Sequence, residues 1–358
     1  MTVDAEGMLR PRQISATELS TGFHPSRETA IGLGVLSLAG LVFVLQVTVG
    51  SVQYSGLASS VSAYALIVAI AAFGQGLVML SGGFDLSIPW VMSMSALAIT
   101  RFADGSDSRA LWVAPAILAA GAFIGVVNGL GIVMLRLPAI VMTLAMNVVL
   151  QGLVLLYTEG SARGVSPPSL RKVMDEDLPG TPIPGPVVLL AVLLLAGTLL
   201  QSKTGFGRRV ASVGASARTA FLSGVNNARV VVSVYAISGV SAALAGVILA
   251  GYSGQSTLAM GDPYLLPTIA AVVLGGAAVA GGRGVFLGTL AGALFIAVVQ
   301  SVLATMSVDA AWRTVIFGTV ILFSAVVLQP GTITWARRLG GMARPSSAAV
   351  VGRSQDAS

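Results

Sequence analysis

Cysteine, histidine and charged residues are scarce or missing in this 358-residue chain, and each shortage excludes a class of site or protein. The absence of cysteine excludes disulfide bonds and thiolate metal sites. The one histidine, His24, lies in a polar N-terminal stretch, so neither a metal site nor a cofactor is expected. Charged residues make up only 9% of the chain, whereas soluble domains contain about 25%. The composition is therefore not that of a soluble globular protein.

Long apolar runs take up most of the sequence and predict an all-α, polytopic membrane protein. Hydrophobic residues account for 55% of the chain, and the mean hydropathy is +0.89. The 43 glycines suit close helix packing in lipid. Because a helix needs about 20 residues to cross the hydrocarbon, we predict about ten transmembrane or partly re-entrant helices. They are expected at 30–49, 57–80, 88–100, 110–135, 137–157, 185–202, 230–252, 264–280, 285–305 and 312–329.

The distribution of charge between these segments predicts the orientation in the membrane. With ten crossings and the N-terminus inside, the inner segments contain 14 Lys and Arg residues against six acids. The outer segments contain the other six basic residues and eight acids. Because basic loops stay on the cytoplasmic side, residues 1–29 and 330–358 are expected to be cytoplasmic tails, the second one disordered. The net charge of +6 then comes from basic inner loops and tails that lie beside anionic lipid. No nucleic-acid partner is expected.

Residues 203–229, named the basic segment, interrupt the apolar sequence with five Lys and Arg residues and no acid. From Ala215 to Leu222 the segment has the small and apolar side chains of a short surface helix. A short helix between two membrane spans offers a surface on which a soluble partner can dock. We therefore predict that the basic segment is a docking site on the cytoplasmic side.

Residues 158–184 form the one long outer loop of this topology. Five prolines and the acidic run 175–177 predict an extended, solvated segment. The loop is either a surface for an external partner or a plain connector, and the sequence favours neither.

Titratable residues are almost missing from the predicted spans, which argues against an ion-coupled carrier, because such carriers use buried charges. Asp85 is the one candidate and lies at a junction between two spans. No G-x-x-x-x-G-K-[ST] phosphate loop occurs, so the chain is not expected to be an enzyme with its own ATP site. The amides in the spans either line a path for a neutral solute or join helices by hydrogen bonds: Gln75, Asn128, Asn147 and Gln151.

Two glycine-rich interruptions predict breaks in the membrane helices. In the first, Gly82 and Gly83 end one helix, and Asp85 or Ser87 caps the next, which has Pro89 in its first turn. Asp85 either only caps that helix or contributes directly to a translocation path. The second break has four glycines of the same kind: Gly275, Gly276, Gly281 and Gly282. Transporter halves often contain such matching interrupted segments.

These patterns together resemble the permease subunit of bacterial ABC importers for simple sugars, of the ribose, xylose and galactoside type. The most specific marks are the segment 82–87, close to the family's G-G-[IF]-D-L-S, and the motifs within 205–225 and 270–289. Residues 138–144 also fit the stretch before the family's fifth span. The resemblance covers nearly all of 30–329, which is expected to be the permease domain.

The resemblance implies a subunit of the bacterial inner membrane that forms a translocation path and does no covalent chemistry. Its implied partners are a cytoplasmic ABC ATPase, an extracytoplasmic binding protein that delivers the sugar, and a second copy or a related permease. The basic segment is then the cytoplasmic coupling segment, and the implied ATPase contacts are Gly207, Arg208, Gly214, Ala220, Ser223 and Gly224. Pro89, Trp90 and 217–219 depart from the family pattern, which leaves the sugar and the pairing partner open.

Two other functions stay open at this point. A related ABC permease for branched-chain amino acids, or for another small polar solute, has the same general architecture. An ion-coupled secondary carrier is the second alternative. It is disfavoured by the shortage of buried titratable residues and by the basic segment, which has no obvious use without a docking subunit.

Overall fold

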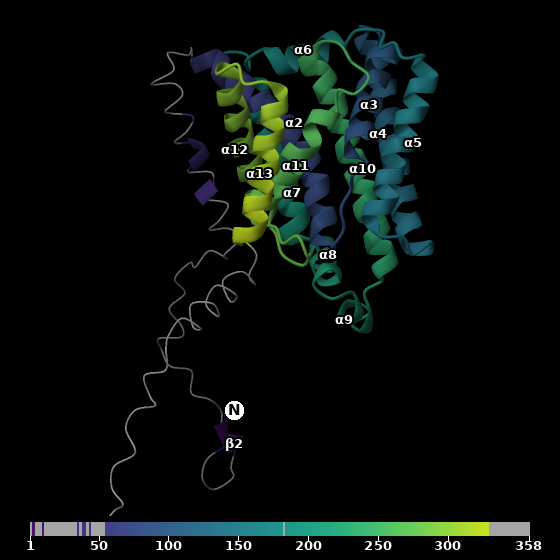
Figure 1. Ribbon diagram of the computed structural model, residues 1–358, viewed down its shortest axis with the longest axis vertical. Helices are drawn as coiled ribbons and strands as arrows, with labels where there is room; N and C mark the ends of the chain where they lie inside the picture. Colours follow the sequence, from purple (N-terminus) through teal and green to yellow (C-terminus); the bar gives the residue numbers. More distant parts are fainter. Residues whose placement is uncertain are drawn as a thin grey trace, which may run out of the picture.

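The computed structural model describes residues 2–3, 9–10, 34–35, 38–40, 43, 54–181 and 183–328, and these are mostly helical (Figure 1). The strands β1 (Thr2–Val3) and β2 (Leu9–Arg10) pair antiparallel and are two residues long each. The prediction of an all-α protein is confirmed for this part of the chain, apart from that short strand pair.

The long apolar helices run roughly along one axis and correspond to the second to the tenth of the expected segments, but the eighth, expected at 264–280, ends at Leu274 because the second break follows it. The first expected segment, 30–49, lies mostly outside the described residues. Among the described residues, six helices are long and apolar enough to cross a membrane, and the total of ten crossings stays a prediction. The helices are α2 (Tyr54–Leu80), α3 (Ile88–Ala103), α4 (Asp107–Met134), α5 (Ala139–Thr158), α7 (Gly185–Thr198), α10 (Asn227–Ser253), α11 (Leu265–Leu274), α12 (Phe286–Thr305) and α13 (Ala310–Leu328), with short turns η2 (Leu199–Lys203) after α7 and η3 (Asp262–Tyr264) before α11.

Helices α2 and α10 form the centre of the bundle. α10 packs against α2, α3 and α4, and α2 packs in addition against α7, α11 and α12. Small residues let the helices approach closely: a Cβ on Gly125 of α4 would overlap the Tyr235 carbonyl of α10. Several of the largest fully buried side chains, among them Leu66, Ile67 and Tyr235, belong to these two central helices. Most of α2 and α10 is therefore shielded from lipid.

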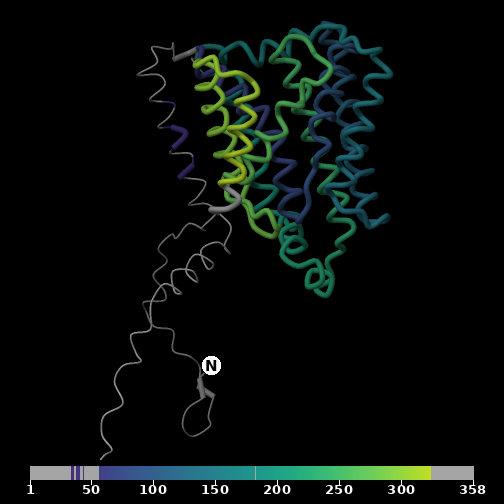
Figure 2. The backbone as a smooth tube through the Cα atoms, in the orientation of Figure 1, coloured from purple at the N-terminus to yellow at the C-terminus, as the bar shows by residue number. Residues whose placement is uncertain are grey.

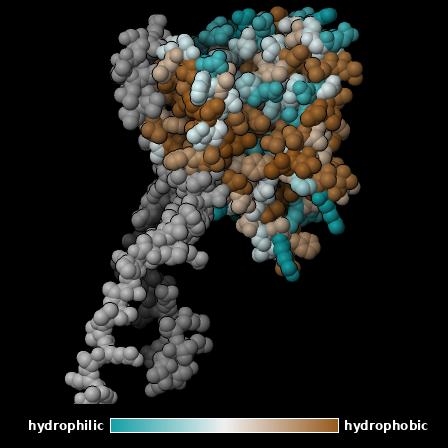
Figure 3. All heavy atoms as spheres, viewed as in Figure 1, coloured by the Kyte–Doolittle hydropathy of each residue, from teal (hydrophilic) through white to brown (hydrophobic). Residues whose placement is uncertain are grey.

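The outer helices expose a broad apolar surface. Figure 3 shows hydrophobic atoms, in brown, around the middle of the bundle and hydrophilic atoms, in teal, mainly near its two ends. Large apolar side chains such as Leu156, Val192 and Leu322 are exposed on α5, α7 and α13. Apolar patches of this extent mark membrane or protein contacts. The surface is therefore one that a bilayer covers.

The basic segment forms two short helices at one end of the bundle, α8 (Gly205–Ala215) and α9 (Ala217–Leu222). Each begins at a hydroxyl side chain, Thr204 or Ser216, that accepts a backbone N–H of the first turn. Helix α9 confirms the predicted short helix of this segment. Helix α8 is an addition that the sequence pattern did not indicate.

The connecting segments gather at two opposite ends of the bundle (Figure 2). At one end, the Gly105 N–H donates to the Val165 carbonyl and the Ser166 N–H donates to the Gly254 carbonyl, both at 3.0 Å. At the other end lie α8, α9 and the links that follow α2 and α11. The first group consists of segments expected outside and the second of segments expected inside. The fold therefore separates the two groups as the charge pattern requires.

The prediction that 158–184 is extended is wrong for its middle part, where Pro168–Asp175 form helix α6. The first residue of this helix is a proline, which suits that position because its fixed φ is already helical. Met174 is 3% exposed, and Leu170 lies against Gly251 of α10. The loop therefore folds over the end of the bundle, and its apolar side chains anchor it there.

Candidate functional site

The first break separates α2 from α3 by a non-helical link that contains residues 84–87. Helix α2 ends at Leu80, and Gly82 has a positive φ of 89°, as predicted for a glycine that ends a helix. Gly83 serves another purpose. A Cβ at this position would lie 2.5 Å from the Tyr235 hydroxyl oxygen, so the approach of α10 accounts for the glycine.

Side chains from three helices form hydrogen bonds with the backbone of residues 84–86. The Tyr235 hydroxyl of α10 donates to the Phe84 carbonyl at 3.1 Å. Thr143 Oγ1 of α5 accepts the Leu86 N–H at 3.0 Å. Gln75 Oε1 of α2 accepts the Asp85 N–H at 3.3 Å. Non-helical backbone persists at membrane depth only where protein groups replace water as partners. The break is therefore a built feature of the fold.

Asp85 is 1% exposed, and its carboxylate joins the start of α3 to α10. Oδ1 accepts the Ser87 N–H at 3.0 Å and the Ser87 hydroxyl at 2.6 Å, and Oδ2 accepts the Ser238 hydroxyl of α10 at 2.7 Å. Asn128 of α4 donates to the Ser87 hydroxyl oxygen at 3.0 Å. We name Gln75, Asp85, Ser87, Asn128 and Ser238 the Asp85 cluster. It connects the start of α3 to α2, α4 and α10.

The expected capping of α3 takes an altered form. Ser87 is the residue before the helix, but its side chain caps no helical N–H and donates to Asp85 instead. Asp85 accepts the backbone N–H of Ser87 and so fixes the turn that leads into α3. Pro89 lies in the first turn, as predicted. In this chain the Asp85 carboxylate is buried and enclosed by its hydrogen-bond partners.

The four amides that the sequence put forward fall into two groups. Gln75 and Asn128 are 0% exposed and belong to the Asp85 cluster. Asn147 lies one turn beyond Thr143 on α5 and is half-buried, and Gln151, a further turn along, is exposed. The first two join helices, Asn147 has a buried Oδ1 atom, and only Gln151 is exposed on this single chain.

The second break, between α11 and α12, is held mainly by backbone geometry. Gly276, Gly281 and Gly282 have positive φ values of 88°, 91° and 78°. Backbone hydrogen bonds of 2.9–3.2 Å close the turn. Gly275 has an ordinary φ, but a Cβ there would overlap the backbone of Gly288 on α12. No acid of the described residues takes the place that Asp85 has in the first break.

Both breaks meet the end of α8 at one point. The Gly282 N–H donates to the Leu80 carbonyl at 2.9 Å. A Cβ on Gly214 would lie 2.6 Å from the Gly282 nitrogen and would overlap the Leu80 carbonyl. A Cβ on Gly281 would lie 2.8 Å from the Gly82 Cα. We name Gly82, Gly214, Gly281 and Gly282 the glycine junction, in which three segments touch backbone to backbone.

Three of the six residues implied as ATPase contacts are packed against other parts of this chain. Gly207 and Ala220 are buried, and a Cβ on Gly207 would overlap the Gln201 carbonyl. Gly214 belongs to the glycine junction. These three positions therefore fix the basic segment to the bundle.

The other three implied contacts are on the surface. Arg208, Ser223 and Gly224 are exposed. At the end of α9, Phe221 and Leu222 are 68% and 77% exposed, although both are apolar and the basic segment is polar around them. This end of the molecule therefore presents an apolar tip with basic residues nearby.

Sequence reasoning missed three side chains that hold the first break. Thr143 lies within 138–144, a stretch that the family resemblance had already marked. Tyr235 and Ser238 are one turn apart on α10, in a run of small and apolar residues. Nothing in that run distinguishes them from other polar residues of a membrane helix, so only the fold brings them to Asp85.

A bundle of apolar helices with a lipid-facing surface, two broken helices and a basic segment packed against both breaks is the architecture of a membrane permease. The chain belongs to the family described as "Branched-chain amino acid transport system / permease component", which matches residues 57–325. It is a multi-pass protein of the cell membrane.

Several curated relatives match over most of their length. The ribose import permease protein RbsC of Escherichia coli (strain K12) is 33% identical over 266 residues, which are 72% of this chain and 81% of that protein. The autoinducer 2 import system permease protein LsrC of Enterobacter sp. (strain 638) is 33% identical over 297 residues, 83% of this chain and 85% of that protein. The inner membrane ABC transporter permease protein YjfF of Escherichia coli (strain K12) is 29% identical over 305 residues, 83% of this chain and 92% of that protein. No solved structure matches the chain. The resemblance inferred from the motifs is confirmed.

Proposed function

We propose that this chain is the membrane-spanning permease of an ATP-driven importer for a sugar. It forms the path for a sugar that an extracytoplasmic binding protein delivers, and a cytoplasmic ATPase supplies the energy. Support comes from the relatives, since RbsC is named a ribose import permease and YjfF an ABC transporter permease. The chain contributes no ATP site and performs no covalent chemistry.

The observation that carries the proposal is the glycine junction. A docked ATPase pulls on α8 and α9, and α8 touches Leu80 and Gly282 with no side chain between the backbones. Backbone contacts of this kind transmit displacement without loss to side-chain rotation, because packed interiors deform little. Movement of the basic segment therefore reaches α2 and α3 through the first break and α11 and α12 through the second.

The docking surface is the exposed part of the basic segment. Phe221 and Leu222 fill an apolar groove on the ATPase, and Arg208, with Arg209 and Arg218 on the same segment, meets acidic residues around it. Apolar anchors surrounded by charge are the usual composition of an interface centre and its rim. Gly207, Gly214 and Ala220 contribute indirectly by fixing the helices to the bundle.

This assignment also sets the orientation. The end that contains α8 and α9 faces the cytoplasm, as the five basic residues of 203–229 require. The opposite end, closed by α6, faces the binding protein. Both chain termini are then cytoplasmic.

The translocation path lies between two permease copies. Gln151 on α5 is exposed on the single chain, and a second copy would enclose it, whereas Asn147, one turn before it, is half-buried with a buried Oδ1 atom. Neutral amides bind a sugar loosely enough for release. Asp85 contributes to the path only by holding the start of α3, because its carboxylate is already bound to Ser87 and Ser238.

The proposal is tested by purifying the chain in mild detergent from its native membrane and identifying the proteins that co-purify. An ATPase with a phosphate loop and a secreted sugar-binding protein are the expected partners. In vesicles, the reconstituted complex is expected to import ribose or another simple sugar only when ATP is present on the side of the membrane that corresponds to the cytoplasm. Uptake that follows a proton or sodium gradient and ignores ATP would contradict the proposal.

A second candidate substrate class is favoured by the description of the family itself, which names branched-chain amino acids. The same vesicles distinguish the two classes. We expect uptake of a simple sugar and none of leucine, isoleucine or valine. Amino-acid uptake without sugar uptake would move the chain to the second class while leaving the ABC mechanism in place.

A further inference from the structure

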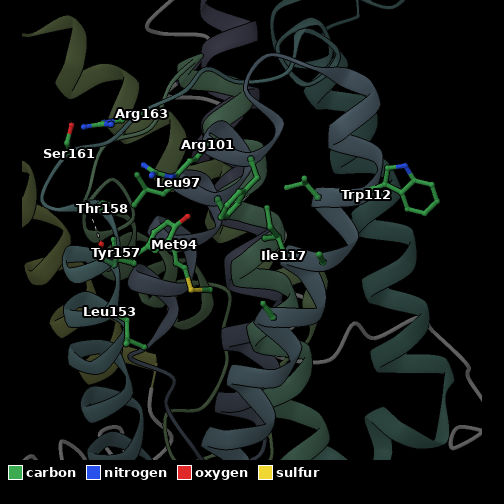
Figure 4. A pocket seen from close by; sticks show the side chains of 16 residues that line it. Met94, Leu97, Arg101, Trp112, Ile117, Leu153, Tyr157, Thr158, Ser161 and Arg163 are labelled. Atoms are coloured by element: carbon green, nitrogen blue, oxygen red, sulfur yellow. Dashed lines mark hydrogen bonds between the residues drawn. The ribbon is translucent and has the colours of Figure 1, made fainter.

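An apolar cleft opens between α3, α4 and α5 at the end of the bundle where α6 lies (Figure 4). Its volume is about 660 Å³, which is within the range of ligand pockets. The walls are apolar side chains of all three helices, such as Leu97, Ile117 and Leu153. The transport proposal assigns no role to this cleft.

Two arginines stand at the mouth of the cleft. Arg101 occupies the last turn of α3, and Arg163 lies in the segment after α5. Figure 4 shows both near the same end of the cleft, above Met94 and Leu153. The Arg101 guanidinium carbon lies 5.0 Å above the Tyr157 ring, which orients it beside the opening.

The two arginines have no carboxylate partner among the described residues. Asp104 and Glu159 lie at the same helix ends, but neither forms an ion pair with Arg101 or Arg163. Two cations therefore stand beside an apolar cleft with no anionic partner among the described residues. The ligand must therefore supply both a negative group and an apolar body.

The shape of the cleft fits a chain rather than a compact solute. Its wall on α4 runs from Trp112 to Ala120, and at 1.5 Å per residue this is a depth of about 12 Å. Below the mouth, most of the lining side chains are apolar and offer no hydrogen-bond partner to the hydroxyl groups of a sugar. The Thr158 hydroxyl already donates to the Val154 carbonyl of its own helix at 2.7 Å. An apolar chain is the ligand that such walls accommodate.

We propose that this cleft binds an anionic phospholipid, with one acyl chain between α3, α4 and α5 and the phosphate on Arg101 and Arg163. The exposed apolar faces of α4 and α5 place the cleft against the bilayer, which supplies this ligand at high local concentration. Arginine binds phosphate through paired N–H donors, and each basic residue near an anionic membrane surface adds to the attraction. The proposal depends on the membrane location of the chain and is independent of the transported solute.

The test measures lipid binding to the delipidated full-length chain by native mass spectrometry. The probes are phosphatidylglycerol and phosphatidylcholine with identical acyl chains. We expect the wild-type chain to bind phosphatidylglycerol about thirtyfold more tightly, the combined effect of two arginines. The double variant R101Q/R163Q is expected to lose this preference. The matched control R109Q/R171Q removes two arginines that do not line the cleft, and it is expected to keep the preference.

A second pair of variants tests the apolar part. Ala116→Phe fills the cleft and is expected to weaken binding of both lipids, whereas Ala119→Phe, on the same helix but outside the cleft, leaves it unchanged. Equal affinity of the wild-type chain for both lipids would overturn the proposal. So would unchanged binding in Ala116→Phe, or a loss of preference in the R109Q/R171Q control equal to that in R101Q/R163Q. A permease dimer that excludes lipid while the monomer binds it would also overturn it, because a second copy would then cover the cleft.

Discussion

The two helix breaks look alike in sequence but are held by different forces. In the first, side chains of four other elements close around 84–87, and the Asp85 carboxylate accepts three hydrogen bonds. In the second, backbone hydrogen bonds and glycine geometry do most of the work, and Gln201 adds a side-chain bond by donating to the Gly284 carbonyl at 3.0 Å. The first break is specified mainly by polar side chains, and the second mainly by glycine backbone geometry.

This difference predicts how each break responds to change. A buried polar group that loses its partner costs free energy because no water replaces it. A glycine with a positive φ and a backbone neighbour instead cannot take any side chain at all. Both breaks meet at the glycine junction, so damage to either one is expected to reach the basic segment.

The largest effect is expected at the second break. Gly282→Ala places a Cβ 2.7 Å from the Ala215 Cα and forces alanine into a φ of 78°. Because the neighbour is backbone, no rotamer change relieves the overlap, and we expect a loss of about 3 kcal/mol. Thermal unfolding of the purified permease in detergent measures it. Gly224→Ala is the control, since Gly224 has a φ of 82° but nothing within 4 Å. Equal losses in the two variants would show that glycine is needed at position 282 because of the positive φ alone. Contact at the glycine junction would then not be the reason.

A smaller effect is expected when the centre of the first break is changed. Asp85→Asn keeps the volume but replaces one acceptor oxygen by a donor, so the hydroxyl or N–H groups of Ser87 and Ser238 lose a partner. We expect a loss of about 2 kcal/mol in the same unfolding experiment. Asp177→Asn in the exposed loop is the control and should have little effect. A stable Asp85→Asn variant that fails in transport would instead assign Asp85 to the path.

The smallest effect is expected from a single contact of the Asp85 cluster. Ser238→Ala removes the hydroxyl that donates to Asp85 Oδ2 at 2.7 Å, and a hydrogen bond to a charged group contributes about 1.5 kcal/mol or more. Ser241→Ala, on the same helix, removes a hydroxyl that binds the carbonyl of Ile237 in its own helix. We expect the unfolding temperature to fall clearly in the first variant and slightly in the second. The reverse order would remove α10 from the account of the first break.

Sequence patterns located most of the apolar helices, because apolar length is set locally by the chain. They also placed both breaks, since glycine and proline end helices wherever they occur. The partners of Asp85 could not be predicted, because Tyr235 and Ser238 are some 150 positions away along the chain. The same limit applies to Gly214. The family resemblance implied an ATPase contact there, and only the packing of α8 shows that the Gly214 backbone lies against Leu80 and Gly282.

The central claim is that the basic segment moves both breaks through the glycine junction. The most direct test is Gly214→Ala in vesicles that contain the permease with its ATPase and binding protein. Gly205→Ala is the matched control, because it makes the same change in the same helix, where the atom nearest to the added Cβ is Arg208 Nη2 at 3.9 Å. The measurement is ATPase bound per permease together with sugar imported per ATP hydrolysed. The account predicts that Gly214→Ala keeps its ATPase but loses most of its import, while Gly205→Ala keeps both. Import in Gly214→Ala equal to that in Gly205→Ala would contradict it.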